Sequence, residues 1–404
     1  MPLPATDRIA GIEVTRLDAF QRKERDRFVR SRPRAAKAGP ALRDSWLGGV
    51  PMHWMTDWPM PHLPLVAQAS GATLTDIDGF EIDDFCLGDT GSMFGHSPPP
   101  VARAIRAQAR RGLTYMLPTD AAIVAGRLLC EVFGPYRWQV ATTATDANRF
   151  ALRVARAVTG RPKVLVFDGC YHGTVDETMV TRDGALTVNR PGLLGQFTDL
   201  SGSAVCCRFN DLADVAAALA AGDVAAILTE PVMTNSCMVL PAPGFLDGLR
   251  RLATEAGALL IIDETHTIST GRGGYARLHG LLPDMLVVGK CVAGGVPAAV
   301  WGMTDAVAAR YVEVNADRAP GHSGMGTTLS GNPMQFACLA ATLGEVMTEK
   351  AYSRMDDGAA RLAKGLAKAI VHSDLPWHVV RVGARVEFVC APGPLQDEIG
   401  RAHV

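Results

Sequence analysis

Short apolar runs alternate with longer amphipathic stretches from about Gly71 onward, and this alternation constrains the fold more than any other feature of the sequence. Four runs are apolar in the middle and end in polar or glycine residues: "RPKVLVFDGCYHG", "GDVAAILTEPV", "GALLIIDETHT" and "PDMLVVGKCVAGG". Helical patterns lie between them, such as "ATDANRFALRVARAVTG", which ends on a glycine suited to a C-cap. The alternation is typical of βαβ units, so we predict an α/β fold with a mostly parallel central sheet flanked by helices.

The length of 404 residues allows two or three domains at roughly 150 residues each. Pro- and Gly-rich joints occur at "SWLGGVPMHWMTDWPMPHLP" and "RAPGHSGMGTTLSGNP". We therefore predict a large domain over residues 71–305, with segments 1–70 and 306–404 forming a smaller α/β domain. The basic stretch 16–39 also contains acidic residues, and its apolar residues have near-helical spacing, so we expect a solvated helix with one packed face.

Charge and cysteine content exclude several classes of protein. Forty basic and 41 acidic residues give a formal net charge of -1, so no overall field attracts nucleic acid or an anionic membrane. No apolar run reaches the roughly 18 residues of a membrane helix, and the N-terminus lacks the apolar core of a signal peptide. The nine cysteines are scattered without CxxC or zinc-type His/Cys spacing, so we expect a reduced, cytoplasmic protein with no metal site.

Polar residues follow the four apolar runs at the points where the strands should end: Tyr171-His172, Glu230, Asp263-Glu264 and Lys290. Ligands of open α/β sheets bind beyond the carboxyl ends of the strands, so these residues are expected to share one crevice. A carboxylate at one strand end and a lysine at the next is what pyridoxal phosphate chemistry requires. Taken alone, however, Lys290 also fits a solvated lysine at a strand end.

The start of the helical pattern after "QVATT" offers a second element of such a site. Small and hydroxyl residues stand where free backbone N–H groups and the helix dipole favour a phosphate. The same residues also suit a plain helix N-cap.

In order and approximate separation, several motifs resemble the class III aminotransferases, the fold type I pyridoxal-phosphate enzymes that include glutamate-1-semialdehyde aminomutase. The motifs are "GHSPPPV", "TTATDANRFALRVARAVTG", "GCYHG", "LTEPV", "LLIIDETHT", "VVGKCVAGGVPAAVWG" and "TTLSGNP", and the resemblance runs from about Trp54 to Pro333. It implies pyridoxal 5′-phosphate as the cofactor, a small-molecule amine donor and a carbonyl acceptor.

The resemblance also implies roles for individual residues. Lys290 matches the Schiff-base lysine and Asp263 the aspartate that pairs with the pyridine nitrogen. Tyr171 matches the aromatic residue that stacks on the ring, and His172 continues the family triplet. Thr328 matches the threonine that reaches the phosphate of the neighbouring subunit, which implies a homodimer.

Four further positions are less settled by the resemblance. Ala144 and Thr145 match the residues that hold the phosphate, but Ala144 stands where relatives have a glycine, which has more backbone freedom. Glu230 matches a site glutamate before proline, although a strand-end carboxylate without a role fits equally. His266 replaces the usual Gln or Met, and either hydrogen-bonds the phenolate oxygen of the cofactor or is simply packed.

These features predict an aminotransferase that works by ping-pong Schiff-base chemistry. The alternatives are an aminomutase or racemase on the same fold, or an inactive relative. A nucleotide-binding dehydrogenase does not fit, because the glycines of "GHSGMG" are in the wrong order and follow no strand. The arginine that aminomutases carry near the entrance is not found in "PMHWMTDWPMPHLPL", which argues against glutamate-1-semialdehyde as the substrate.

The C-terminal sequence also departs from the family, whose members continue beyond "HVVRVGARVEFVC" to complete the small domain. Here the sequence ends at "QDEIGRAHV", and residues Ile399 to Val404 match one reading frame of a common sequencing adapter. We therefore expect an assembly artefact. If the ending is real, we expect an incomplete small domain with uncovered apolar surface and poor solubility.

Overall fold

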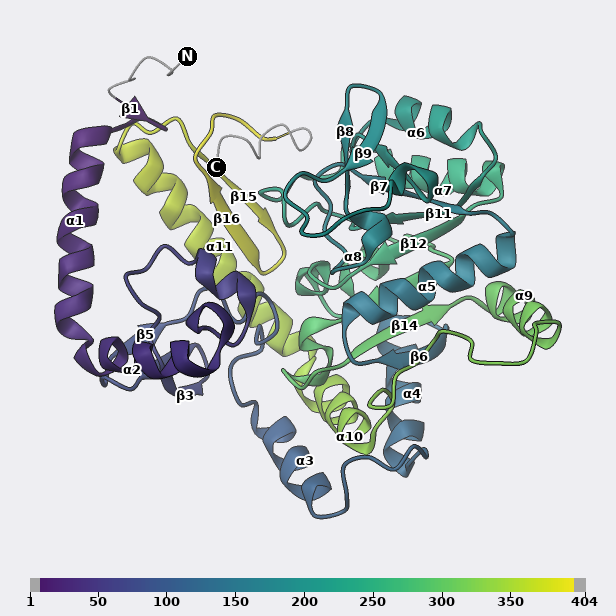
Figure 1. The fold of residues 1–404 in the computed structure, drawn as a ribbon, viewed down its shortest axis with the longest axis horizontal. Coiled ribbons are helices and arrows are strands. Elements are labelled where there is room, and N and C mark those ends of the chain that lie inside the picture. Colours follow the sequence, from purple (N-terminus) through teal and green to yellow (C-terminus); the bar gives the residue numbers. More distant parts are fainter. Residues whose placement is uncertain (1–7, 396–404) are drawn as a thin grey trace.

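A seven-stranded sheet forms the centre of the larger lobe in the computed structural model, which describes residues 8–395 (Figure 1). Its strand order is β10-β7-β11-β12-β13-β14-β6, and only β14 runs antiparallel to its neighbours. The strands are β6 (Arg137–Ala141), β7 (Lys163–Phe167), β10 (Ala204–Cys207), β11 (Val224–Thr229), β12 (Leu259–Asp263), β13 (Met285–Val288) and β14 (Ala299–Met303). The four apolar runs of the sequence are the adjacent strands β7, β11, β12 and β13, so the predicted fold class is confirmed.

Helices pack against the central sheet. Helix α5 packs across β11, β13 and β14, and α7 packs against β11 and β12. The helices of this lobe are α3 (Pro99–Ala109), α4 (Asp120–Phe133), α5 (Ala144–Thr159), α6 (Leu212–Leu219), α7 (Phe245–Ala256), α8 (Gly274–Leu278), α9 (Asp305–Ala316) and α10 (Pro333–Ala341). A short hairpin, β8 (Val180–Asp183) and β9 (Leu186–Asn189), lies beside β10. Because the inner strands are buried on both faces, their sequences are continuous apolar runs.

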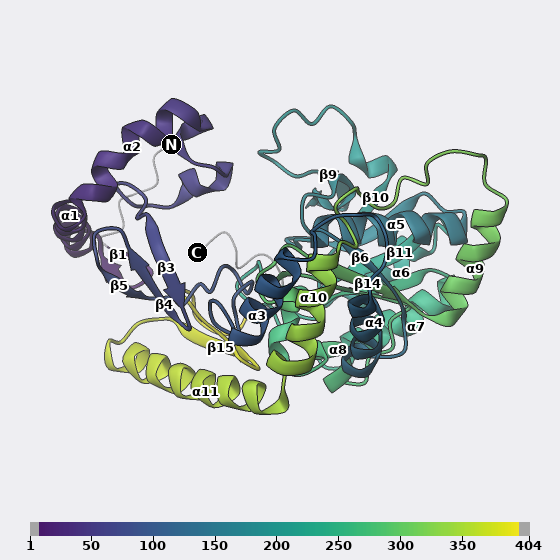
Figure 2. The same ribbon diagram turned by 90° about the horizontal axis from the view of Figure 1, so that it is seen from below.

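The smaller lobe combines segments from the two ends of the chain (Figures 1 and 2). The indole Nε1 of Trp377 donates to the Ala10 carbonyl at 2.7 Å and ties the two segments together. The elements are β1 (Arg8–Ile9), β2 (Ile12–Glu13), α1 (Val14–Ser31), α2 (Pro33–Ser45), the sheet of β3 (Val66–Ser70), β4 (Thr73–Asp76) and β5 (Glu81–Asp83), α11 (Glu349–His372), and the hairpin of β15 (His378–Val382) and β16 (Arg385–Val389). The expected domain boundaries stay a prediction. The one at residue 70 falls between two strands of the same small sheet.

The stretch 16–39 is helical as predicted, but its apolar face is only half-buried, at Leu17 and Phe28. The chain forms two helices there, α1 and α2, because Pro33 cannot continue the ladder of the preceding helix. Helix α1 has no buried residue, and Phe20 is 62% exposed. Only Phe28 makes a ring contact, with His62 at 5.0 Å.

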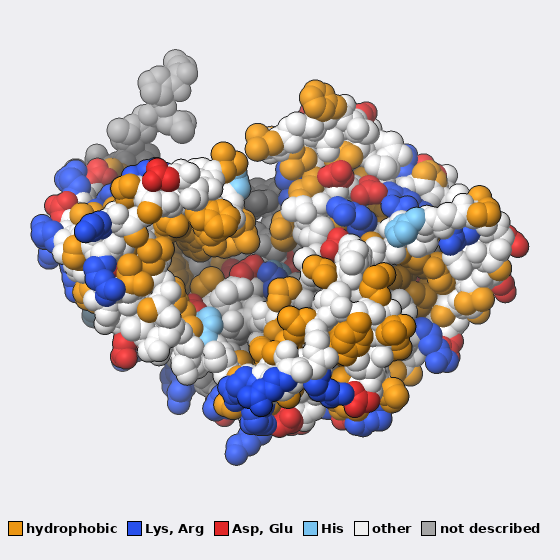
Figure 3. All heavy atoms as spheres, turned by 60° about the horizontal axis from the view of Figure 1, so that its bottom comes forward, with side chains coloured by type: hydrophobic (Ala, Val, Ile, Leu, Met, Phe, Trp, Pro, Cys, Tyr) orange, Lys and Arg blue, Asp and Glu red, His pale blue; other side chains and the backbone are white. Residues whose placement is uncertain are grey.

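The surface is hollowed where the two lobes meet (Figure 3). Within residues 8–395, no helix combines the length and the apolar character needed to cross a membrane. Free thiols are present at Cys86, Cys130, Cys170, Cys206, Cys207, Cys291, Cys338 and Cys390. The residues Ile399 to Val404, for which an artefact is expected, lie outside the described part of the chain.

Candidate active site

The carboxyl ends of β7, β11, β12 and β13 open into one cavity of about 380 Å³. Eight of the nine residues expected at the site line it, and they come from four strand ends, a helix start and the loops beside them. They are Ala144, Thr145, Tyr171, His172, Glu230, Asp263, His266 and Lys290. The crevice expected from the strand ends is therefore present in the structure.

Lys290 lies inside this cavity and is not a solvated strand-end lysine. Its side chain is 21% exposed, and Nζ donates to Oδ2 of Asp89 at 2.6 Å. The residue begins a short 3-10 turn, Lys290–Ala293, with φ of 49°, a left-handed conformation that is uncommon for a residue other than glycine. Backbone strain of this kind often marks a functional position, because the surrounding fold must hold it in place.

Asp89 is the anionic partner of Lys290. Burial opposes its ionised form, but electrostatic interactions with His266, Lys290 and Arg385 lower the pKa of the Asp89 carboxyl. The lysine ammonium is therefore matched by a carboxylate within the cavity. This pairing holds the amine in one position while it is free.

Asp263, at the end of β12, is buried and held as a carboxylate by three donors. His172 Nδ1 lies 3.0 Å from Oδ2, Asn148 Nδ2 donates to the same oxygen at 2.8 Å, and the Thr265 N–H donates to Oδ1 at 3.0 Å. Although burial opposes ionisation, these contacts lower the pKa of Asp263. Burial also opposes the charged His172 ring, yet Cys170 and Asp263 raise the pKa of His172 to about 10. Asp263 thus offers a fixed negative charge at the cavity wall.

The start of helix α5, Thr143 to Thr145, faces the cavity and is suited to bind an anion, and we call it the anion cradle. Thr143 caps the helix by accepting from the Asp146 N–H, and the N–H groups of Ala144 and Thr145 have no partner within the helix. The hydroxyl of Thr145 accepts from the Thr174 N–H at 3.1 Å. A helix N-terminus of this kind favours an anion.

Two glycines let the cradle approach its neighbours. A Cβ added at Gly289 would lie 2.8 Å from the Ala144 Cβ, and one at Gly173, where φ is 77°, would lie 2.1 Å from Thr145 Oγ1. Ala144 itself begins a regular helix, so its position does not need the backbone freedom of glycine. The methyl group of Ala144 is accommodated by the absence of a side chain at Gly289.

Glu230 and Tyr171 complete the wall. Glu230 is 4% exposed and accepts from the backbone N–H and the hydroxyl of Thr234, and burial raises the pKa of its carboxyl to about 7. Tyr171 follows β7 and is 41% exposed, so its ring is free to lie against a ligand.

His266 is 4% exposed and sits between the two lobes of the molecule. Its Nδ1 lies 3.0 Å from Thr90 Oγ1 and 3.1 Å from Nη1 of Arg385, the first residue of β16. Burial first, and then the nearby cations Lys290 and Arg385, lower the pKa of His266 to about 3. The ring is therefore neutral at physiological pH.

Thr328 is the one expected site residue that does not line the cavity. It lies in an exposed turn, 328–331, before α10. Ser330 of this turn has its hydroxyl 3.3 Å from the Thr142 hydroxyl, next to the anion cradle. The expected contact of Thr328 with a neighbouring subunit stays a prediction.

The cavity has the chemistry to hold pyridoxal phosphate. Among the described residues, 12 buried side-chain nitrogen or oxygen atoms have no hydrogen-bond partner, and four of these belong to residues that line this cavity. They are His172 Nε2, Glu230 Oε1, Thr265 Oγ1 and His266 Nε2. Buried polar groups without partners are rare in native proteins, so their concentration here indicates a site built for a polar ligand. The anion cradle, the carboxylate of Asp263 and the amine of Lys290 fit a phosphate, a pyridine nitrogen and an aldehyde.

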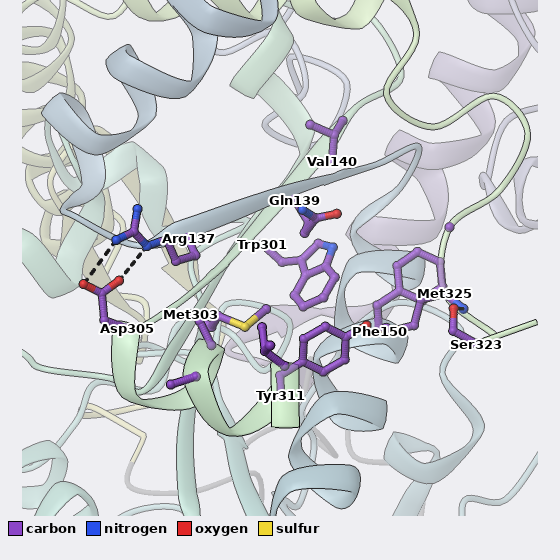
Figure 4. Close-up of a pocket in the computed structure, with 14 residues that line it drawn as sticks. Arg137, Gln139, Val140, Phe150, Trp301, Met303, Asp305, Tyr311, Ser323 and Met325 are labelled. Carbon is purple, nitrogen blue, oxygen red and sulfur yellow. Dashed lines mark hydrogen bonds and ion pairs between the residues drawn. The ribbon is translucent and has the colours of Figure 1, made fainter. Parts of the chain in front are cut away.

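A larger cavity of about 670 Å³ lies between β6, β14 and α9 (Figure 4). Its two charged residues neutralise each other, because Arg137 Nε donates to Asp305 Oδ1 at 2.6 Å. The side chains of Phe150, Trp301 and Met303 form much of its wall. Its lining contains no lysine that could bind an aldehyde. The larger of the two cavities is therefore not the candidate active site.

Sequence reasoning missed four residues of the site: Asp89, Thr90, Asn148 and Arg385. Asn148 was detectable, since it is the polar residue on the otherwise apolar face of the amphipathic helix α5. Asp89 and Thr90 lie in a loop in which Leu87, Gly88, Asp89 and Thr90 all have positive φ. Arg385 comes from the small lobe, and no local pattern connects it to residue 266.

Comparison with known proteins agrees with this geometry. The family model described as "Aminotransferase class-III" matches residues 56–389. The chain belongs to the class III aminotransferase family.

Relatives of this class III enzyme include proteins named glutamate-1-semialdehyde 2,1-aminomutase. The one from Roseiflexus castenholzii is 36% identical over 339 residues, which are 83% of this chain and 77% of the relative. The one from Heliobacterium modesticaldum is 34% identical over 338 residues, 82% of this chain and 76% of the relative.

Solved structures give the same result. A glutamate-1-semialdehyde aminomutase from Pseudomonas aeruginosa PAO1 superposes with a TM-score of 0.94 at 48% identity, covering 97% of this chain and 88% of that one. A β-phenylalanine aminotransferase from Variovorax paradoxus has a TM-score of 0.83 at 25% identity, covering 96% and 86%. A lysine variant of the P. aeruginosa protein was solved in complex with PMP. The cofactor of this class III enzyme is pyridoxal 5′-phosphate.

Proposed function

We propose that this class III enzyme is an aminomutase, which moves an amino group from one carbon to another within a single molecule. The observation that carries the proposal is the meeting of Lys290, Asp263 and the α5 N-terminus in one cavity, together with the relatives named as aminomutases. An aminotransferase, the main expectation from the sequence, is the second candidate. The β-phenylalanine aminotransferase of the same fold favours it.

The residues divide the work by their positions. Bound pyridoxal phosphate supplies an aldehyde that condenses with amines and a pyridinium ring that accepts electrons. Asp263 keeps a proton on the pyridine nitrogen, because His172 and Asn148 hold the carboxylate ionised and in place. Ala144 and Thr145 bind the phosphate through backbone N–H groups and a hydroxyl. Tyr171, an exposed aromatic side chain in the cavity lining, would lie against the ring.

Lys290 holds the cofactor at rest and acts as the base during the reaction. Its Nζ, once free, would be placed to take a proton from the substrate carbon and to return it. Asp89 lies 2.6 Å from this amine and keeps it within the cavity between the two roles. An aminomutase and an aminotransferase share these steps, and they differ in whether the first carbonyl product leaves the site.

Two measurements test the proposal. Protein incubated with pyridoxal phosphate should show a visible band that borohydride fixes covalently, whereas Lys290→Ala should bind cofactor without the fixable band.

The loaded protein is then given glutamate-1-semialdehyde alone, and products are followed by mass spectrometry and NMR. Conversion to the isomer with a shifted amino group, without free keto product, supports the aminomutase. Release of a keto product refutes it. Stoichiometric use of a carbonyl acceptor, added in a second reaction, favours the aminotransferase.

We further propose that the enzyme acts as a homodimer in which Thr328 contacts the phosphate in the neighbouring subunit. The exposed turn that carries Thr328 is adjacent to the anion cradle of its own chain through Ser330. Light scattering should give twice the mass of the chain. Thr328→Val should weaken pyridoxal phosphate binding, whereas Thr327→Val, one residue away, should not. A monomer that binds cofactor normally refutes the proposal.

A further inference from the structure

His266 is the point where the small lobe touches the cofactor cavity. The His266 ring lines the cavity, while Arg385 reaches it from β16, across 119 residues of sequence. Thr90 contacts the same ring nitrogen from the loop before α3. Arg385 is itself held by Glu387, which accepts from its Nε at 3.0 Å.

The chemistry of arginine decides which ring nitrogen carries the proton. A guanidinium has five N–H donors and no acceptor, so the His266 nitrogen 3.1 Å from Nη1 must accept. Arg385 Nη1 also lies 3.4 Å from the Thr90 hydroxyl oxygen, which leaves the Thr90 proton free to point at the same His266 nitrogen. A hydroxyl alone suits either tautomer, because it both donates and accepts. The direct contact with Arg385 removes this freedom.

A neutral ring that accepts at Nδ1 carries its proton on Nε2. His266 is neutral in this environment: burial acts first, Lys290 and Arg385 also oppose protonation, and Asp89 and Asp263 are the opposing charges around it. Nε2 is buried and has no hydrogen-bond partner, and it lies 3.9 Å from Asp89 Oδ2. It is thus a donor reserved for a ligand of the cavity.

We propose that Arg385 is a positioning residue that fixes the tautomer of His266, so that Nε2–H donates to the phenolate oxygen of the bound cofactor. The part concerning the cofactor rests on the function proposed above. Arg385 does not line the cavity, so it acts through His266 rather than by touching the substrate. The small lobe thereby ensures that residue 266 presents a hydrogen-bond donor to the cavity. A glutamine at this position would need no such partner, because a carboxamide always carries a donor.

The tautomer is measured first in cofactor-free protein with ¹⁵N-labelled histidine, and His266→Gln assigns the signals. The parent should show an unprotonated Nδ1 and a protonated Nε2 at His266. Arg385→Met should show a mixture of tautomers, because the Thr90 hydroxyl can donate to an unprotonated Nδ1 or accept from a protonated one. Thr90→Val is the matched control, since it removes the other partner of the same nitrogen, and it should keep the parental tautomer. Nδ1–H in the parent, or an unchanged tautomer in Arg385→Met, overturns the proposal.

The consequence for the cofactor is measured by titrating the visible band of protein loaded with pyridoxal phosphate. A donor on the phenolate oxygen lowers that oxygen's affinity for the shared proton, so losing it should raise the apparent pKa of the band. Arg385→Met should raise the apparent pKa of the band by about one pH unit, which means that the bound cofactor holds its proton about tenfold more tightly. Arg385→Lys, which also presents donors only, should keep the parental pKa and serves if the Met variant does not fold.

A double-mutant cycle separates positioning from a direct effect of charge. In the His266→Gln background, Arg385→Met should shift the pKa by less than half as much as it does with histidine present. Equal shifts in the two backgrounds overturn the proposal, because they show that Arg385 acts through its charge alone. Absence of any visible band in the folded parent refutes the proposed function instead, and leaves the tautomer measurement to decide the link between Arg385 and His266.

Discussion

Replacing Asp263 by asparagine should expose the energetics of the buried pair with His172. The His172 side chain has no solvent exposure and that of Asp263 is 4% exposed. A rise of the histidine pKa from 6.5 to about 10 corresponds to about 5 kcal/mol of preference for the charged ring in the folded state. Breaking a buried ion pair usually costs 3–5 kcal/mol. We therefore expect Asp263→Asn to lower the free energy of unfolding at pH 6 by about 3–5 kcal/mol.

The pH dependence of this loss follows from the direction of the shift. A histidine pKa that is raised in the folded state contributes stability that is complete below 6.5 and is lost as the pH rises through about 10. At pH 9.5 the same two pKa values leave about 1 kcal/mol of this contribution. The lowered pKa of Asp263 keeps its carboxylate ionised throughout this window. Cys170 is the larger cause of the raised pKa, so Asp263 supplies only part of this contribution. The difference between parent and variant should therefore shrink by about 1–2 kcal/mol between pH 6 and pH 9.5.

The assay is urea unfolding of the cofactor-free protein at the two pH values, because bound cofactor would add its own interaction with Asp263. Glu255→Gln is the matched control: it removes a carboxylate from an exposed pair with Arg251, in which the side chains are 57% and 59% exposed. This change should alter stability by less than about 0.5 kcal/mol at either pH. A loss in Asp263→Asn that is equal at pH 6 and pH 9.5 would refute the assignment of a charged His172.

Two further substitutions test other parts of the site. Gly289→Ala places a methyl group 2.8 Å from the Ala144 Cβ, so it should weaken pyridoxal phosphate binding at least about tenfold in a fluorescence titration, and Ala144→Gly in the same chain should restore it. Failure of the second change to restore binding would count against the steric explanation. Glu230→Gln should raise the thermal midpoint at pH 8 but not at pH 4.5, because a carboxyl pKa raised by burial to about 7 destabilises the folded state only as the pH rises above 4.5. An unchanged midpoint at pH 8 would contradict this.

The sequence was sufficient to predict the central strands and the residues at their carboxyl ends. Each inner strand is buried on both faces and reads as an apolar run, and the polar residue that ends the run necessarily faces the crevice. Asp263 and Lys290 were found in this way, because β12 and β13 are neighbours with matching ends. The α5 start was found because capping and helix periodicity are local properties.

The remaining site residues depend on contacts that no local pattern encodes. Asp89 meets Lys290 across 201 positions, through a loop in which Leu87, Asp89 and Thr90 are left-handed although they are not glycines. Arg385 meets His266 only because the β15–β16 hairpin is placed against the large lobe. The predicted packed face of α1 is only half-buried for a related reason, since apolar spacing does not say how far another element covers it.

The left-handed backbone at Lys290 has a consequence for the balance between folding and function. A residue with a Cβ is held there at a cost of about 1–3 kcal/mol, while Cys291, Val292 and Ala293 directly after it are buried and anchor the turn. Glycine would adopt the same conformation without strain. Selection for stability alone would therefore favour glycine at position 290. Keeping a lysine there lowers the stability of the folded chain and places an amine in the cavity.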